Sequence, residues 1–341
     1  MSLSLSPHKD VETLQLVNSL RRANGEPVSG EAIGQELGVS RAAVWKRIEG
    51  LRSLGYQIES VPRRGYTLIS EPETPTPEAV GGFLSSVVLD DGLFGPEKII
   101  FYQKTDSTNV QAGILARQGA KDGTVVVADH QTEGKGRLGR VWESPIGGNL
   151  YFSLILRPEI EPRYAAQLTL LTGLALAEAI SGVGADGVEI KWPNDLLLGG
   201  RKVAGILTEM AVEESQIQFV VIGVGVNVNV ELTGFTEEIG NIAATLSGHL
   251  KKQIKRSAFL ADFLSRFLGW YRWYLAEGFA PIRSIWLKQS RIKGRRVQVN
   301  LLDESFTGWA VDLDVDGFLL VKREDTGVEA RVLAGDVFLI R

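Results

Sequence analysis

A proline-rich run close to residue 70 restricts the fold of this chain more than any other feature of its sequence. Glu71-Pro-Glu-Thr-Pro-Thr-Pro77 contains three prolines within six residues. Proline has no backbone N–H to donate within a helix or a central strand. The run therefore predicts a linker over residues 71–80, with one folded unit before it and the remainder of the 341 residues after it.

The composition is that of a globular protein and excludes several kinds of site. The chain has no cysteine, which rules out disulfides, thiol nucleophiles and cysteine-based zinc sites. Its three histidines, His8, His130 and His249, lack metal-ligand spacing, so we predict no protein metal site. Residues 1–10 do not resemble a secretory signal, and no apolar run reaches the ~18 residues of a membrane span. We expect a cytoplasmic protein that makes no membrane contact.

The first unit, residues 1–70, has the pattern of a winged helix-turn-helix. A first helix ends at Asn24-Gly25, a second begins at the capping residue Ser29, and Gly38 turns the chain into Ser40, which caps a third. Two short helices joined by a tight glycine-containing turn are typical of a helix-turn-helix. A β-hairpin with the basic tip Pro62-Arg-Arg-Gly65 follows and would form the wing.

The third helix has an apolar face and a cationic face. Val44, Ile48 and Leu51 recur at helical spacing and would face the core. The net charge of −4 gives no general attraction to DNA, so a local basic face must supply it. The predicted DNA-binding residues are Ser40, Arg41, Lys46, Arg47, Arg63 and Arg64. The alternative is a protein-interaction module whose cations are merely solvated.

The rest of the chain predicts two further domains. In residues 81–290, helices over 108–118 and 164–180 interleave with strands over 124–129, 150–156, 188–191 and 219–228, which favours an α/β-type layer domain with a mixed sheet. A tryptophan-rich helical stretch, 259–288, closes it. In residues 291–341, short alternating runs separated by turns indicate a small SH3-like β-barrel. The whole chain is therefore predicted to be an α+β multidomain protein.

The segment Gln131–Arg140 places three cations among closely spaced glycines directly after an apolar strand. Glycines let backbone N–H groups approach an anion, so the segment predicts a cradle for a phosphate or a carboxylate. Gly134, Gly136 and Gly139 also satisfy the G-x-G-x-x-G pattern of dinucleotide folds. That interpretation fails because the residues that follow lead into a strand rather than a helix. A basic surface loop remains the alternative.

A second signal is Lys191-Trp-Pro-Asn-Asp195, where a strand ends in a lysine and a rigid turn presents an amide and a carboxylate. Alone it could be an ordinary strand-to-turn junction. Together with the downstream segments Arg201–Glu209 and Gly223–Asn229 it indicates a functional site.

These segments resemble a known family along essentially the whole chain. Ser29–Val44 and Val61–Leu68 resemble the DNA-binding domain of bifunctional biotin operon repressors. Asp106–Asn109, the glycine-rich loop with Trp142, and Lys191–Asp195 resemble the catalytic domain of biotin-protein ligases. The resemblance implies that ATP activates biotin to biotinyl-5′-AMP and that biotin is transferred to a lysine of biotin carboxyl carrier protein. It also implies biotin-responsive repression at operator DNA by a homodimer of the adenylate-bound protein.

The resemblance further implies roles for individual residues. Carboxylate attack on the α-phosphate builds negative charge, so Arg137 and Lys191 are the predicted catalytic residues. The predicted biotin-binding residues are Ser107, Thr108, Asn109, Gln131, Lys135, Gly136, Arg137, Trp142, Lys191 and Gly205. The predicted ATP-binding residues are Lys135, Arg137, Asn194 and Asn227, with Mg²⁺ bridging the phosphates. The family more often has arginine at position 135, and no residue is assigned to cover adenine, although Phe235 lies in the loop after Asn229.

Two other functions stay open at this point: a lipoate or octanoate ligase, and a biotin-sensing transcription regulator without catalysis. Two further motifs are given structural interpretations. Asp312-x-Asp314-x-Asp316-Gly317 lacks the acid that completes a calcium loop and is predicted to be a hairpin turn. The aromatic stripe is predicted to pack in the core; it consists of Phe267, Trp270, Tyr271, Trp273 and Tyr274.

Overall fold

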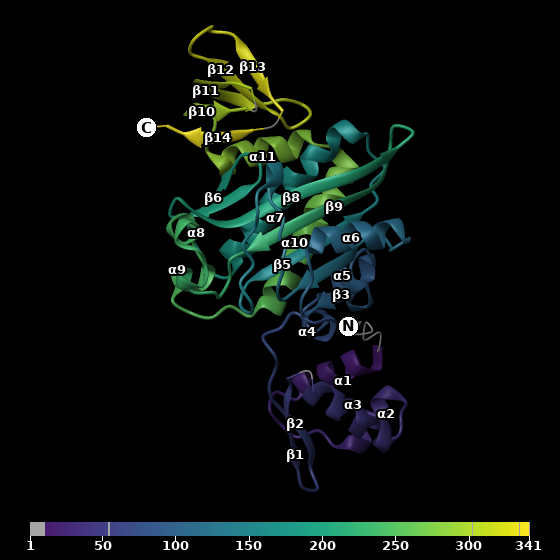
Figure 1. The fold of residues 1–341 in the computed structure, drawn as a ribbon. Coiled ribbons are helices and arrows are strands. Elements are labelled where there is room, and N and C mark those ends of the chain that lie inside the picture. Colours follow the sequence, from purple (N-terminus) through teal and green to yellow (C-terminus); the bar gives the residue numbers. More distant parts are fainter. Residues whose placement is uncertain (1–10, 54, 302, 334, 341) are drawn as a thin grey trace.

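The computed structural model describes residues 11–53, 55–301, 303–333 and 335–340, which form three successive units along the chain (Figure 1). His8 and the rest of residues 1–10 lie outside the described residues. A helical unit with a projecting hairpin stands at one end, a large sheet with helices fills the middle, and a small sheet stands at the other end. The predicted multidomain α+β organisation is confirmed.

The N-terminal unit contains the predicted winged helix-turn-helix elements. They are α1 Val11–Arg22, α2 Gly30–Leu37, α3 Arg41–Ser53, β1 Gln57–Val61 and β2 Gly65–Ser70. Ser29 Oγ accepts the backbone N–H of Ala32 at 3.0 Å, and Gly38 ends α2 with a φ of 67°. The unit has its own apolar core, made by Leu16, Val17, Leu20, Ile33, Leu37, Val44, Ile48, Leu51, Tyr56 and Ile58. This apolar core is separate from the main core of the chain.

The segment after β2 is not irregular throughout. Thr76 caps a short helix, α4 Pro77–Gly81, and Pro77 occupies its first turn, where no N–H is needed. Val80 of α4 is buried in the main core of the chain. Helix α5 Ser86–Asp91 follows. The last residues of the predicted linker thus pack with the central unit.

The central unit is built on a seven-stranded sheet of order β3-β4-β5-β9-β8-β7-β6. β3 and β4 pair in parallel and the other neighbours are antiparallel, so the sheet is mixed as predicted. β3 and β7 were not predicted, because neither Ile-Ile-Phe-Tyr nor Asp-Leu-Leu-Leu alternates apolar with polar residues. The strands are β3 Ile99–Tyr102, β4 Thr124–Ala128, β5 Leu150–Leu156, β6 Val188–Lys191, β7 Asp195–Leu198, β8 Arg201–Glu213 and β9 Gln216–Val226.

Helices cover both faces of this sheet. Val126 of β4 packs toward α6 Thr108–Arg117, whereas Val125 and Val127 point to the opposite core. Three helices contribute to that opposite core: α7 Ala165–Gly182, α10 Arg256–Glu277 and α11 Ala280–Ser290. Among the described helices, the segment Pro162–Gly182 is long and apolar enough to cross a membrane, but 72% of its window is buried, because α7 is a core helix. Smaller elements are α8 Glu237–Ile242 and α9 Leu246–Leu250.

The predicted helical stretch 259–288 is two helices, because Gly278 ends α10 with a φ of 72°. The aromatic stripe packs largely as predicted. Phe267, Tyr271 and Tyr274 are buried, and Trp273 is 38% exposed.

The C-terminal unit is a five-stranded antiparallel sheet of order β13-β12-β11-β10-β14. Its interior valines and Trp286 of α11 belong to one continuous core with the central unit. In the β11–β12 turn, Asp314 accepts the backbone N–H groups of Asp316 and Phe318, and both acids pair with Arg331. The predicted hairpin turn is confirmed. The strands are β10 Arg296–Asn300, β11 Ser305–Leu313, β12 Leu319–Arg323, β13 Glu329–Val332 and β14 Asp336–Leu339.

A buried ion pair joins four separate segments of the fold. Arg256, the first residue of α10, places Nη1 2.8 Å from Asp129 Oδ1 and 2.7 Å from the carbonyl oxygen of Asn149. Its Nε donates to the carbonyl oxygen of Glu73 at 3.2 Å. The side chains of Arg256 and Asp129 are 3% and 7% exposed. The guanidinium therefore connects the linker, the end of β4, the start of β5 and the start of α10.

We expect Arg256→Leu to lower the free energy of unfolding by about 3–5 kcal/mol, because the substitution leaves Asp129 as a buried charge without its partner. Urea unfolding measures this effect. Arg266→Leu is the matched control on the same helix, since its ion pairs with Asp262 and Glu178 are more exposed, and it should cost less than ~1 kcal/mol. Equal losses in the two variants would contradict the role assigned to Arg256.

Candidate functional site

A buried hydrogen-bond network fixes the first residues of α6 beside the loop that follows β4. The backbone N–H of Thr108 donates to Gln131 Oε1 at 2.8 Å, and the Thr108 hydroxyl lies 3.2 Å from the same oxygen. Ser153 Oγ of β5 lies 2.8 Å from Thr108 Oγ1 and 2.6 Å from Asn109 Oδ1. Asn109 also donates to Glu209 of β8 at 2.7 Å. These side chains, with the buried Ser107, form a polar corner held by two strands, a loop and a helix.

A flat apolar surface adjoins this corner. Gly205 of β8 and Gly225 of β9 are directly paired across the sheet, and the indole of Trp142 lies against them. A Cβ atom would lie 2.8 Å from Trp142 Cζ3 at Gly205 and 2.5 Å from Trp142 Cε2 at Gly225, so only glycine admits the ring. The buried Nε1 of Trp142 has no hydrogen-bond partner among the described residues.

Four cations from three segments gather next to this surface, and we call Arg137, Arg140, Lys191 and Lys202 the cation cluster. Arg137 Nη1 donates to Asn194 Oδ1 at 3.3 Å and to the carbonyl oxygen of Gly335 at 3.4 Å. Lys191 Nζ lies 4.5 Å from the centre of the Phe338 ring. Two carboxylates face the four cations: Arg140 pairs with Asp336, and Lys202 Nζ lies 2.7 Å from Asp195 Oδ1. The surroundings therefore favour an anion.

Burial shapes the charge of this cluster. It lowers the pKa of Lys191 and the pKa of Arg137, because removal from water disfavours a charged group, while Asp195 and Asp336 act in the opposite direction on both. The hydrogen bond from Arg140 lowers the pKa of Asp336. An incoming anion would thus meet partly desolvated positive charges.

The Lys191–Asp195 motif forms the β6–β7 hairpin, in which Lys191 and Asp195 are paired residues. The Trp192–Pro193 peptide bond is cis. Asn194 is locked in place, because its Nδ2 donates to the carbonyl oxygen of Ile206 at 2.7 Å while its Oδ1 accepts from Arg137. The predicted residues Arg137, Lys191 and Asn194 are therefore brought together.

Asn227 follows β9 and is 3% exposed. Its Nδ2 lies 3.4 Å from the carbonyl oxygen of Lys202, and its buried Oδ1 has no partner among the described residues. An unpaired buried acceptor is costly, and a hydrogen-bond donor placed at this oxygen would remove that cost. Phe235, in the segment between Asn229 and α8, is buried.

The glycine-rich segment folds back on itself as a narrow loop. The backbone N–H of Gly136 donates to the carbonyl oxygen of Arg140 at 2.7 Å, and that of Trp142 donates to the carbonyl oxygen of Gly134 at 2.8 Å. Leu138 has a φ of 55° at the turn. Lys135 is exposed on this loop, and the described residues show no hydrogen bond or ion pair that draws it into the cation cluster.

Several contacts at the site were not predicted. Gly335, Asp336 and Phe338 come from the C-terminal unit, and no local pattern marks them as neighbours of residues that precede them by more than a hundred positions. Glu143, directly after Trp142, accepts the backbone N–H of Thr236 at 3.0 Å and its hydroxyl at 2.5 Å. This contact joins the glycine-rich loop to the segment after Asn229.

The predicted DNA-binding residues lie on one unit but differ in their contacts. Arg41, Lys46 and Arg63 are exposed, and Ser40 caps α3 by accepting the N–H of Ala43 at 3.3 Å. Arg47 pairs with Glu12 of α1. Arg64 lies 3.1 Å from Glu26 with both side chains largely exposed, so this pair is easily opened.

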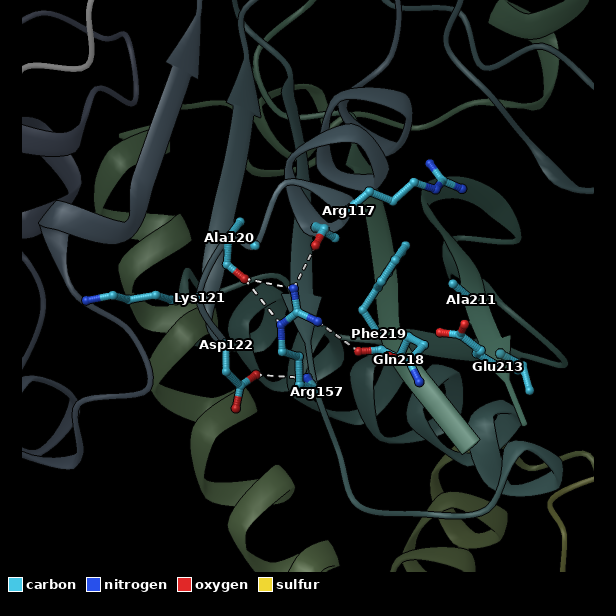
Figure 2. Close-up of a pocket in the computed structure, with 12 residues that line it drawn as sticks. Arg117, Ala120, Lys121, Asp122, Arg157, Ala211, Glu213, Gln218 and Phe219 are labelled. Carbon is cyan, nitrogen blue, oxygen red and sulfur yellow. Dashed lines mark hydrogen bonds between the residues drawn. The ribbon is translucent and has the colours of Figure 1, made fainter. Parts of the chain in front are cut away.

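A separate cavity of about 800 Å³ lies at the other end of α6 (Figure 2). Its central cation, Arg157, donates to the carbonyl oxygens of Ala116, Ala120 and Gln218. Figure 2 shows the guanidinium turned toward these backbone groups, so it joins α6 to β9 rather than offering its donors to a ligand. None of the predicted site residues lines this cavity.

Three family models match successive parts of the chain. An HTH domain model matches residues 12–67, the Biotin/lipoate A/B protein ligase family matches 101–227, and the Biotin protein ligase C terminal domain matches 293–340. These matches follow the order of the three structural units.

Whole proteins and solved structures agree with the models. The chain is 37% identical over 324 residues to the bifunctional ligase/repressor BirA of Bacillus subtilis (strain 168), covering 95% of this chain and 97% of that protein. It is 34% identical to the bifunctional ligase/repressor BirA of Escherichia coli (strain K12), covering 93% and 94%. A structure of the biotin protein ligase from Aquifex aeolicus in complex with biotin and ATP superposes with a TM-score of 0.61 at 32% identity, covering 71% of this chain and 98% of that one.

We expect Gly225→Ala to lower the free energy of unfolding by about 1–3 kcal/mol, because its methyl group would collide with the Trp142 ring. Gly269→Ala on α10 is the control, since a Cβ there meets open space and alanine favours a helix. Urea unfolding of both variants decides the matter. A Gly225→Ala protein as stable as the control would show that the indole does not rest on this glycine.

Proposed function

The chain belongs to the bifunctional biotin ligase/repressor family, and on that basis we propose that it activates biotin with ATP, transfers biotin to a lysine of biotin carboxyl carrier protein, and represses transcription at operator DNA. The enzymatic part of this proposal rests on one observation: the cation cluster lies beside the flat apolar surface of Gly205, Gly225 and Trp142 and beside the polar corner. A small polar head, an apolar body and a reacting phosphate need those three surroundings in one place. The protein would work in the cytoplasm, where ATP and operator DNA are found.

The polar corner suits the ureido head of biotin, and the flat apolar surface suits its ring and tail. Gln131 and Thr108, with Ser107 beside them, would hydrogen-bond the ureido head. Trp142 and Gly205 would line the apolar ring and tail. Asn109 would keep the polar corner in place through its hydrogen bond with Ser153. Gly136 and the exposed Lys135 lie on the loop that would close over the carboxylate. This arrangement leaves the biotin carboxylate directed at the cation cluster.

ATP would bring its phosphates to the same cluster. Arg137 and Lys191, with Asn194 holding Arg137, would neutralise the α-phosphate, and Lys135 would add a mobile charge. The unpaired Oδ1 of Asn227 suits the adenine amino group as a donor. Among the described residues, no group of three His, Asp or Glu side chains could hold a metal ion, so Mg²⁺ would be held chiefly by the ATP phosphates.

The chemistry then has two steps. A biotin carboxylate oxygen attacks the α-phosphorus, the bond from that phosphorus to the bridging oxygen breaks, and pyrophosphate leaves. Arg137 and Lys191 offset the charge that builds on the phosphoryl oxygens. In the second step the carrier lysine amine attacks the acyl carbon, loses a proton and displaces AMP.

ATP-dependent transfer of biotin to a carrier domain tests this proposal against the two alternatives. Transfer of biotin and not of lipoate supports it. Transfer of lipoate in place of biotin would indicate a lipoate ligase. Binding of biotin without any transfer would indicate a sensor that lacks catalysis.

We predict that Lys191→Ala and Arg137→Ala each slow adenylate formation by roughly 10²- to 10³-fold, because each removes a charge directed at the developing phosphoryl anion. Arg163→Ala, which alters an exposed pair with Glu161, is the control and should keep the original rate. Single-turnover formation of biotinyl-5′-AMP gives the rates. An unchanged rate in either variant would remove that residue from the catalytic machinery.

Deletion of residues 1–70 should abolish operator binding and largely retain biotin transfer, because the N-terminal unit has a core of its own. Gel-shift and transfer assays on one preparation measure both activities. A folded deletion protein that no longer transfers biotin would show that the N-terminal unit contributes to the active site.

We further propose that the bound adenylate promotes a homodimer that binds operator DNA. The Glu143–Thr236 contact joins the two loops that would close over the adenylate, and ordered loops present a different surface. A non-hydrolysable adenylate analogue should therefore strengthen dimerisation and operator affinity together, at fixed salt. Sedimentation and gel-shift titrations measure these quantities. Tight binding of the analogue with neither quantity changed would refute the coupling.

A further inference from the structure

One large aromatic side chain lies on the outward face of the proposed DNA-reading helix. Trp45 of α3 is 57% exposed, although the residue before it, Val44, is fully buried. Successive residues of a helix are turned by about 100°, so Trp45 lies at the edge of the core face and points into solvent. Trp45 does not belong to the apolar core formed by the described residues of the N-terminal unit.

The cations of α3 fall into two groups: those beside Trp45 are exposed, and those on the sides of the helix contact other parts of the N-terminal unit. Arg47 pairs with Glu12, and Arg52 donates to the carbonyl oxygen of Ile58. Arg41, one turn before Trp45, and Lys46, directly after it, are exposed. The outward face of the first half of α3 is therefore an indole flanked by two exposed cations, a surface that complements DNA.

The position of Trp45 along α3 selects what it can touch. In helix-turn-helix proteins the N-terminal half of the motif's second helix, which is α3 in this chain, contacts base edges in the major groove, while flanking cations contact phosphates. The apolar group that DNA presents in the major groove is the thymine 5-methyl group. An indole offers a broad apolar surface and a single N–H donor, so it matches that methyl group better than the polar edges of guanine or cytosine.

We propose that Trp45 is a specificity-determining residue that reads a thymine 5-methyl group in the major groove of the operator. This inference rests on the proposed DNA-binding function. To that function it adds thymine as the recognised base and Trp45 as the residue that recognises it. Arg41 and Lys46 would instead attract the duplex through its phosphates.

The experiment uses the full chain with biotin and ATP. Binding sites are first selected from a random duplex pool with the unaltered protein, and each thymine of the enriched motif is then replaced by deoxyuridine, which removes only the methyl group. We expect replacement of one recognised thymine in a single half-site to weaken binding about fourfold, the effect of one buried methyl group. Trp45→Ala should bind thymine and deoxyuridine duplexes equally, and Trp45→Phe should keep part of the difference.

Trp309→Ala is the matched control, since Trp309 is 49% exposed in the C-terminal sheet and should leave the preference unchanged. If Trp45→Ala transfers biotin at the original rate and unfolds at the original temperature, the variant is folded. If it is not folded, the comparison is made with Trp45→Phe alone.

The outcomes separate this inference from the function on which it rests. If the unaltered protein enriches no motif, the DNA-binding function itself fails. If it enriches a motif whose recognition is the same in Trp45→Ala, or is indifferent to every deoxyuridine replacement, the inference is wrong while DNA binding stands. A uniform loss of affinity for all duplexes in Trp45→Ala would likewise overturn it, because it would show contact with the backbone alone.

Discussion

The buried guanidinium of Arg256 is the interaction on which most of this structure depends. A buried charge is tolerated only when it is paired and fully hydrogen-bonded, so the four segments that surround Arg256 must meet at one place. Gln131, which holds the polar corner, lies two residues after Asp129. Lys255, beside Arg256, pairs with Glu71, which in turn pairs with Arg21 of α1. One junction thus connects the loop that carries Gln131 with the N-terminal unit.

The C-terminal sheet completes the site rather than merely following it in the chain. Its last strand gives Arg140 a carboxylate partner and places a ring beside Lys191, and the residue before that strand accepts a hydrogen bond from Arg137. These contacts hold three cations in place without neutralising them all. The continuous core shared by the sheet and α11 holds that strand beside the β6–β7 hairpin. The cation cluster is therefore a property of two units packed together.

Local features were predictable from the sequence, and distant contacts were not. The cap at Ser29, the turn at Gly38 and the strand-to-turn junction after Lys191 follow from preferences that act over a few residues. The resemblance to a family supplied the roles of Gln131 and Asn227. The position of Trp142 on the Gly205–Gly225 pair, and of Phe338 beside Lys191, depends on strand register and on packing between units, which hydrophobic periodicity does not encode. β3 and β7 escaped prediction because neither alternates apolar with polar residues.

We propose that the cation cluster serves chemistry between a biotin carboxylate and ATP. Exchange of labelled pyrophosphate into ATP by the purified full chain is the decisive measurement, because exchange requires reversible formation of an acyl-adenylate and no carrier protein. We expect exchange that depends on biotin, is absent with lipoate, and falls to background in Lys191→Ala. A folded protein that binds biotin yet catalyses no biotin-dependent exchange would show that the cluster has another role.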